Sequence, residues 1–150
     1  MDLVPAHLLP LLLALVSGVL MAVQGSVNTA LSKAVGLWEA TFVVHAIGTL
    51  VLLVVLFILK MGRGDLGGLF QAPWYSYLGG VISVFIIYLV AASIPRVGVA
   101  NATTAIIVGQ VMTAVVIDHF GGFGLQKIPC GWSQVAGLAL LAIGARLLLK

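Results

Sequence analysis

The side chains of this sequence best suited to binding a solute are amides, hydroxyls and one imidazole in otherwise apolar stretches. Gln24 and Asn28 are four residues apart, so on a helix they lie on the same face. Amides both donate and accept hydrogen bonds, which suits a polar solute. The same amides could instead hold helices together, a role in which each contributes about 1 kcal/mol. The sequence leaves both roles open.

A second polar stripe consists of Thr41, His45 and Thr49, which recur at every fourth residue of an apolar segment. His45 is the only histidine, carboxylate or cationic side chain well inside such a segment. An imidazole can donate and accept hydrogen bonds, or carry a proton where a partner favours its charged form. A lone histidine is more often a packing residue than a proton relay, so we predict packing and keep proton transfer as the alternative.

The most polar segment contains two sets of uncharged polar residues. Thr103 and Gln110 are seven apart and nearly eclipsed on a helix, whereas Asn101 and Thr104 occupy a different sector. Gly109 permits a close backbone approach. Because a helix with polar groups on two sectors is poorly suited to face lipid on either, we predict that this one lines a central cavity.

The elements that must position these residues are revealed by the spacing of charge. The chain has seven Lys or Arg residues and four Asp or Glu residues. They leave five long uncharged stretches, namely Leu3–Ser32, Ala40–Leu59, Leu66–Pro95, Val97–Ile117 and Ile128–Ala145. A helix of roughly 20 apolar residues crosses a hydrocarbon core about 30 Å thick. We therefore predict an all-α integral membrane protein with five transmembrane helices.

Composition excludes several other classes of protein. With 62% hydrophobic residues, 7% charged residues and a mean hydropathy of +1.25, a water-soluble fold would lack polar surface. The basic residues are scattered, so the formal net charge of +3 does not indicate nucleic-acid binding. Cys130 is the single cysteine and forms no intrachain disulfide. No nucleotide, metal or nucleophile–base motif is present, so we expect no enzyme activity, cofactor or metal.

We predict a single transmembrane domain over residues 1–150. Its spans cover approximately residues 6–31, 40–59, 74–94, 99–117 and 132–149. Trp38 and Glu39 would then lie at the membrane interface before the second span. An odd number of spans places the two ends of the chain on opposite sides of the membrane.

The positive charges give almost no preference for one orientation. Short loops rich in Lys and Arg normally stay on the cytoplasmic side. Here the side that holds the N-terminus has Lys60, Arg63 and Lys127, and the other side has Lys33, Arg96, Arg146 and Lys150. The chain either inserts in one direction on this weak bias, or inserts both ways and pairs head to tail. We favour dual insertion, because inverted repeats are a common way to build transporters.

One region of the sequence resembles a known family. The segments that carry the resemblance are Val97-Gly98-Val99-Ala100-Asn101-Ala102-Thr103-Thr104, Gly109-Gln110, Ile117-Asp118-His119-Phe120 and Pro129. They look like the fourth-span signature of YdcZ-type inner-membrane exporters, five-span bacterial members of the drug/metabolite transporter superfamily. Gln24 and Asn28 also match that group, and the resemblance covers nearly the whole chain.

Gly137 and Gly144 lie on one face of the last predicted span, where small residues let helices approach closely. This pair is similar to the dimerisation motif of small multidrug-resistance transporters, which are four-span relatives that work as antiparallel dimers. The first span lacks the central glutamate on which those relatives couple protons to cationic substrates. The resemblance implies alternating access in a ten-span assembly of two copies.

Together these observations predict a small secondary transporter of a bacterial inner membrane that exports a polar, neutral or zwitterionic small molecule. Its partners would be a second copy of the chain, membrane lipid and the solute, and no nucleic acid. The predicted substrate-binding residues are Gln24, Asn28, His45, Asn101, Thr103, Thr104 and Gln110, and Gly137 and Gly144 form the predicted dimer interface. The alternatives are a non-transporting membrane subunit or assembly factor, and a flippase for a lipid-linked substrate.

Overall fold

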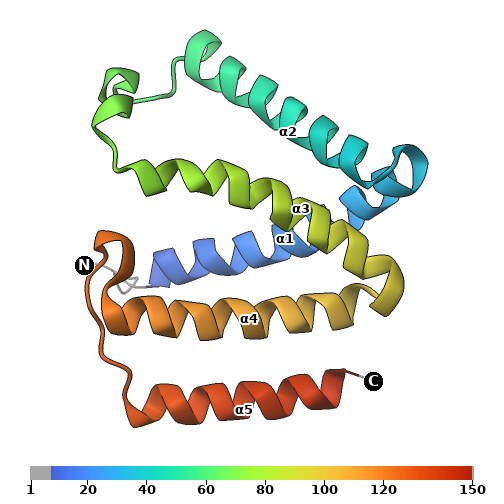
Figure 1. Cartoon of the computed structure of the whole chain (residues 1–150), viewed down its shortest axis with the longest axis vertical. Coiled ribbons are helices and arrows are strands. Elements are labelled where there is room, and N and C mark those ends of the chain that lie inside the picture. The colour runs from blue at the N-terminus through green and yellow to red at the C-terminus, as the bar shows by residue number, and fades with distance from the viewer. Residues whose placement is uncertain (1–7, 150) are drawn as a thin grey trace. The chain divides into compact units, whose positions relative to one another are not determined.

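The structure is a computed structural model that describes residues 8–149, and over this range it contains helices and connecting segments but no strands. The helices are α1 (Leu8–Val35), α2 (Leu37–Leu53), α3 (Leu78–Val97), α4 (Val99–Phe120) and α5 (Trp132–Leu148) (Figure 1). The all-α prediction is confirmed. The predicted start of the first span at residue 6 and the terminal Lys150 lie outside the described residues.

Four helical segments are long and apolar enough to cross a membrane. They are Leu8–Val35, Leu37–Ile58, Trp74–Val97 and Val99–Phe120. The fifth predicted span corresponds to α5, which has 17 residues and is apolar but shorter. A helix of that length extends about 25 Å, slightly less than a hydrocarbon core of about 30 Å. The chain is thus a multi-pass membrane protein, and the crossing by α5 remains a prediction.

The chain packs as two compact units, Met1–Pro95 and Arg96–Lys150. In the first unit, α1 and α2 are joined by the single residue Gly36, whose φ of 102° favours glycine. Glu39 lies in the first turn of α2, and its Oε2 occupies the space in which a Cβ on Gly36 would lie. The carboxylate therefore lies beside the positive end of the α2 dipole, where negative charge is stabilised. Glu39 is exposed at this helix end.

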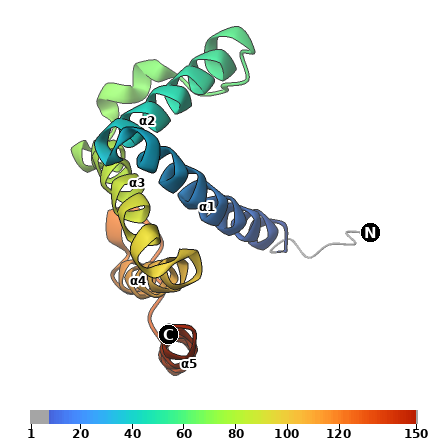
Figure 2. The same ribbon diagram turned by 90° about the vertical axis from the view of Figure 1, so that its right-hand side faces the viewer.

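The buried residues of the first unit are small or polar, apart from Ile94. They come from α1 (Gly25, Asn28, Thr29), α2 (Ala40, Thr41) and α3 (Ala91, Ile94). A Cβ built on Gly25 would lie 2.9 Å from Cγ1 of Val90 and 3.1 Å from Cδ1 of Ile94. The absence of a side chain at Gly25 is what allows α1 to approach α3 here. Away from this contact α1 diverges from α3 (Figure 2).

The N-terminal half of α1 has an entirely different environment. Every residue from Leu8 to Met21 is exposed in the part of the chain that the structure describes. This stretch is apolar on nearly all sides, as is typical of a helix solvated by lipid or covered by another membrane helix.

The connection between α2 and α3 is more ordered than the solvated turn that its glycines indicate. The end of α2 continues as a π-helical turn, Val54–Ile58, and Lys60 then turns the chain with a φ of 51°. Asp65 accepts a hydrogen bond from the N–H of Gly67 (2.7 Å) at the start of a 3₁₀ helix, Leu66–Gln71. The hydroxyl of Tyr77 donates to the carbonyl of Leu69, which fastens this connection to the beginning of the third apolar segment.

In the second unit, the loop after α4 is tied back to the end of that helix. Gly121 ends α4 in the left-handed conformation, with a φ of 66°. The N–H of Ile128 donates to the carbonyl of Asp118 (2.8 Å), and the N–H of Cys130 donates to Nδ1 of His119 (3.1 Å). The side-chain oxygen of Gln134 then accepts the N–H of Gly131 (3.0 Å), which caps the start of α5.

Candidate functional site

The best-defined polar cluster within the apolar helices joins α2 to α3 through His45. Nδ1 of His45 lies 2.8 Å from the carbonyl oxygen of Thr41, one turn earlier on α2. Nε2 lies 3.0 Å from Oγ of Ser83 on α3, and that hydroxyl lies 2.7 Å from the carbonyl oxygen of Gly80. Both His45 and Ser83 are half-buried. The cluster spans two helices and contains an imidazole with both nitrogens engaged.

The two predicted amides of α1 lie in different surroundings. Asn28 is only 7% exposed, whereas Gln24, one turn earlier, is exposed. Thr29 beside Asn28 is also buried, and its hydroxyl donates to the carbonyl of Gly25 (2.8 Å). No side-chain hydrogen bond among residues 8–149 joins Gln24 or Asn28 to His45. The polar face of α1 is thus turned into the protein at Asn28.

The polar residues of α4 keep the angular arrangement expected of one helix. Asn101, Thr103 and Thr104 are half-buried and Gln110 is exposed. The hydroxyl of Thr104 donates to the carbonyl of Ala100 (2.9 Å), so its own helix satisfies it. The predicted residues therefore fall into two groups, one on α1 and α2 in the first unit and one on α4 in the second unit.

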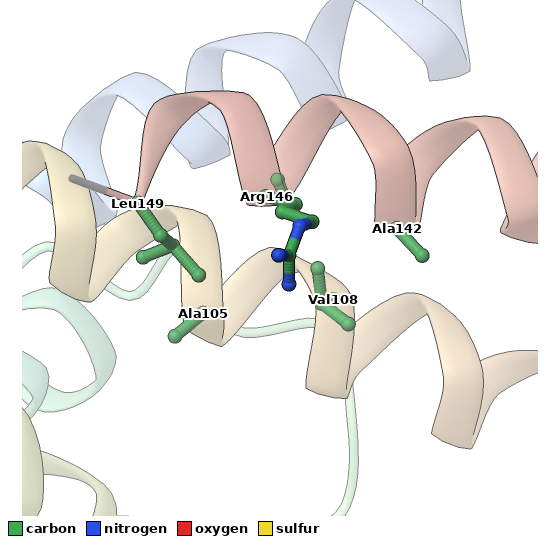
Figure 3. A pocket seen from close by; sticks show the side chains of 6 residues that line it. Ala105, Val108, Ala142, Arg146 and Leu149 are labelled. Carbon is green, nitrogen blue, oxygen red and sulfur yellow. The ribbon is translucent and has the colours of Figure 1, made fainter.

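A groove in the second unit contains the positively charged side chain of Arg146. It is lined by Ala105 and Val108 of α4 and by Ala142, Ala145, Arg146 and Leu149 of α5. The guanidinium group of Arg146 points across the groove toward α4 (Figure 3). The single carboxylate of α4 and α5 is Asp118, near the opposite end of α4 from Ala105. Arg146 therefore has no carboxylate partner among the described residues of this unit.

The glycines predicted to form a dimer interface are open on their helix. A Cβ built on Gly137 or on Gly144 meets no atom within 4 Å in the described part of the chain. The side of α5 that faces α4 is marked by the buried Ala145, and it lies about a quarter turn away from both glycines. Close packing of these glycines against another helix thus needs a partner from outside this unit.

Two residues of the sites above, Ser83 and Arg146, were not singled out from the sequence as binding residues. Ser83 is the only polar side chain between Tyr77 and Tyr88, and such isolation in an apolar helix is a usable signal. The rings of Trp38 and Tyr88 have centroids 4.3 Å apart, a contact that also joins α2 to α3. Arg146 entered only the count of charges. In the described range no group of three His, Cys, Asp or Glu residues is placed to hold a metal ion.

Comparison with known proteins gives the family directly. A family model described as "Putative inner membrane exporter, YdcZ" matches residues 9–147. Searches of the curated proteins and of the solved structures each found no match. The family match spans all five helices, including α5. It supports a transporter rather than an enzyme and places this multi-pass protein in the inner membrane. The chain therefore belongs to the YdcZ family of inner-membrane exporters.

Proposed function

We propose that the protein exports a polar small molecule, neutral or zwitterionic, by alternating access, and that two chains pair antiparallel to form the ten-helix transporter. The observation that carries this proposal is the inward polar face of the first unit. Its buried polar residues are Asn28, Thr29 and Thr41, whereas its large apolar side chains are mostly exposed. Such a protein has its apolar surface toward lipid and its hydrogen-bonding groups inside, as a path for a polar solute requires.

The pairing of two chains is supported by apolar helix surfaces that a single chain leaves exposed. The residues Leu8–Met21 have exposed side chains throughout, and the glycines of α5 have no neighbour within 4 Å among the described residues. In lipid, helices associate through close packing of small residues rather than through the hydrophobic effect. A second copy that packs against Gly137 and Gly144 would supply that contact.

Two features favour a neutral or zwitterionic solute over a bare cation. The helices α1 to α3 carry Lys33, Glu39 and Arg96 at their ends and no acidic group farther inside. In the second unit, Arg146 lies in a groove without a carboxylate partner, and Asn101 is on the same side of α4 as Ala105. A zwitterion could place its carboxylate against this guanidinium, which would repel a cation.

The test is flux through proteoliposomes of the purified full chain, with a solute first identified by a thermal-stability screen of a metabolite library. Asn28→Ala and Gln110→Ala are each expected to lower the initial rate about tenfold, the effect of losing one hydrogen bond of about 1.4 kcal/mol to the solute. Gln71→Ala removes an exposed amide outside the four spanning segments, and should leave flux unchanged.

Unchanged flux in both variants would refute the site assignment. The alternative role, a membrane subunit or assembly factor, has a different signature. It predicts no solute-dependent flux and no stabilisation by any solute. It also predicts strong loss of folding when Asn28 or Thr41 is replaced by leucine, because these residues would then serve only to join helices.

A further inference from the structure

The hydrogen-bond geometry around His45 fixes where one proton must lie. A backbone carbonyl oxygen can only accept hydrogen bonds. The contact of 2.8 Å between Nδ1 of His45 and the carbonyl oxygen of Thr41 therefore requires a proton on Nδ1. In a neutral imidazole the other nitrogen, Nε2, is then without a proton and can only accept.

The hydroxyl group of Ser83 lies within hydrogen-bond distance of two neighbouring atoms. Oγ of Ser83 lies 2.7 Å from the carbonyl oxygen of Gly80 and 3.0 Å from Nε2 of His45. A hydroxyl has one hydrogen to donate and can accept at its lone pairs. If His45 is neutral, that hydrogen bonds either Nε2 or the Gly80 carbonyl, and one of the two contacts is left without a proton.

A further proton on Nε2 removes this conflict. Nδ1–H then donates to Thr41, Nε2–H donates to Oγ of Ser83, and the hydroxyl donates to Gly80. All three contacts are hydrogen bonds in a consistent direction only when the imidazole carries both protons. We infer that His45 and Ser83 form a proton-binding site between α2 and α3. In the export cycle, which rests on the proposed function, this site would bind the coupling proton.

The helices α1, α2 and α3 carry four other titratable groups within the described residues. Lys33 is in the last turn of α1, and Glu39 is in the first turn of α2, about a third of a helical turn around from His45. On α3, the ring of Tyr88 stacks on Trp38, and Arg96 is in the last turn. None of these four groups makes a hydrogen bond or ion pair with His45 in the described part of the chain. The additional proton on Nε2 therefore has Ser83 as its hydrogen-bond acceptor, while the proton on Nδ1 stays with Thr41.

The site suits a proton that binds and leaves. A charged imidazole between apolar helices is costly, so the protonated form must be supported by strong bonds. A charge-assisted hydrogen bond is roughly twice as strong as a neutral one. When Nε2 gives up its proton to a water molecule of the solute path, the Ser83 hydroxyl turns from the Gly80 carbonyl and donates to Nε2. The link between α2 and α3 is kept in both states, so proton exchange does not require the helices to separate.

The direct test is nitrogen-15 NMR of the histidine-labelled full chain in lipid bilayers, titrated between about pH 5 and about pH 8. The His45 signals are assigned by their loss in His45→Asn. We expect the neutral form of His45 to carry its proton on Nδ1, and the doubly protonated form to donate a hydrogen bond from each nitrogen. His119 is the internal control, because its Nδ1 accepts from Cys130 and its neutral form must carry the proton on Nε2.

The Ser83→Ala variant should lower the doubly protonated fraction of His45 at about pH 6 roughly fivefold, and Ser83→Thr, which retains a hydroxyl, should restore it. Unchanged His119 signals verify that the second unit of each variant is folded. If His45 stays singly protonated across the range, or if Ser83→Ala leaves its doubly protonated fraction unchanged, the inference is wrong.

A second measurement separates this inference from the proposed function. In proteoliposomes, a pH gradient should drive solute uphill with the wild-type chain, whereas His45→Asn should permit only downhill flux. If His45 binds a proton but the chain transports no solute, the proposed export is refuted and the proton-binding site is supported. Uphill flux retained in His45→Asn would refute coupling at His45 and leave export standing.

Discussion

Replacing Gly25 with leucine is expected to disrupt the packing of α1 against α3 and to destabilise the folded chain by about 3 kcal/mol or more. The first atom of the new side chain would lie 2.9 Å from Cγ1 of Val90 and 3.1 Å from Cδ1 of Ile94, so these neighbours would have to move. Valine is stiff at χ1 and cannot turn away at low cost. The measurement is the free energy of unfolding in detergent, titrated with a denaturant and followed by circular dichroism.

The matched control is Gly18→Leu on the same helix, seven residues earlier and on nearly the same face. A Cβ built on Gly18 meets nothing within 4 Å in the described structure. Leucine there should leave the folding of the chain unchanged because the space around this Cβ is open. Equal stability of the Gly25→Leu variant and the wild-type chain would show that α1 does not pack on α3 as described.

Replacing both Gly137 and Gly144 with leucine is expected to weaken the association of two chains by at least about tenfold and to abolish flux with it. The two glycines share one face of α5, and the Cβ positions of both are open in the described unit. Leucine side chains would hold an approaching helix away from that face. Dimer content is measured by single-molecule photobleaching in bilayers over a range of protein-to-lipid ratios.

The control for this pair is Ala139→Leu. Ala139 is exposed and lies on the side of α5 away from the glycines, about half a turn around. It should leave both dimer content and flux unchanged. If the double glycine variant forms as much dimer as the wild-type chain, α5 is not part of the interface. If monomers show full flux, transport does not require a second chain.

Much of the helical architecture follows from the sequence, because uncharged apolar stretches leave the backbone no other way to satisfy its hydrogen bonds in lipid. The ends of the helices are predicted less well, because hydropathy indicates which residues lie in the membrane and a helix can continue beyond them. α1 continues through Lys33 to Val35, where the chain reaches Gly36. α3 continues past Pro95 to Val97, because a proline in the last turn removes only one intrahelical bond.

The candidate site was predictable only in part. His45 stands out as an imidazole in an apolar segment, but its pairing with Ser83 depends on the register between α2 and α3. That register is set by the contact of Trp38 with Tyr88 and by the long connection from Lys60, neither of which leaves a periodic signal. The open face of α5 likewise depends on which side of the helix packs on α4. Composition cannot indicate this.

The antiparallel pairing of two chains is the central claim, and Cys130 gives a direct way to test it. It is the single cysteine of the sequence and lies in the connection between α4 and α5. A membrane-impermeant maleimide added to sealed, uniformly oriented cell-membrane vesicles labels only the chains whose Cys130 is on the outer side. Detergent then gives the total, and Cys130→Ser gives the background. Dual insertion predicts that about half of the total is labelled. Labelling of all chains, or of none, would contradict the antiparallel transporter.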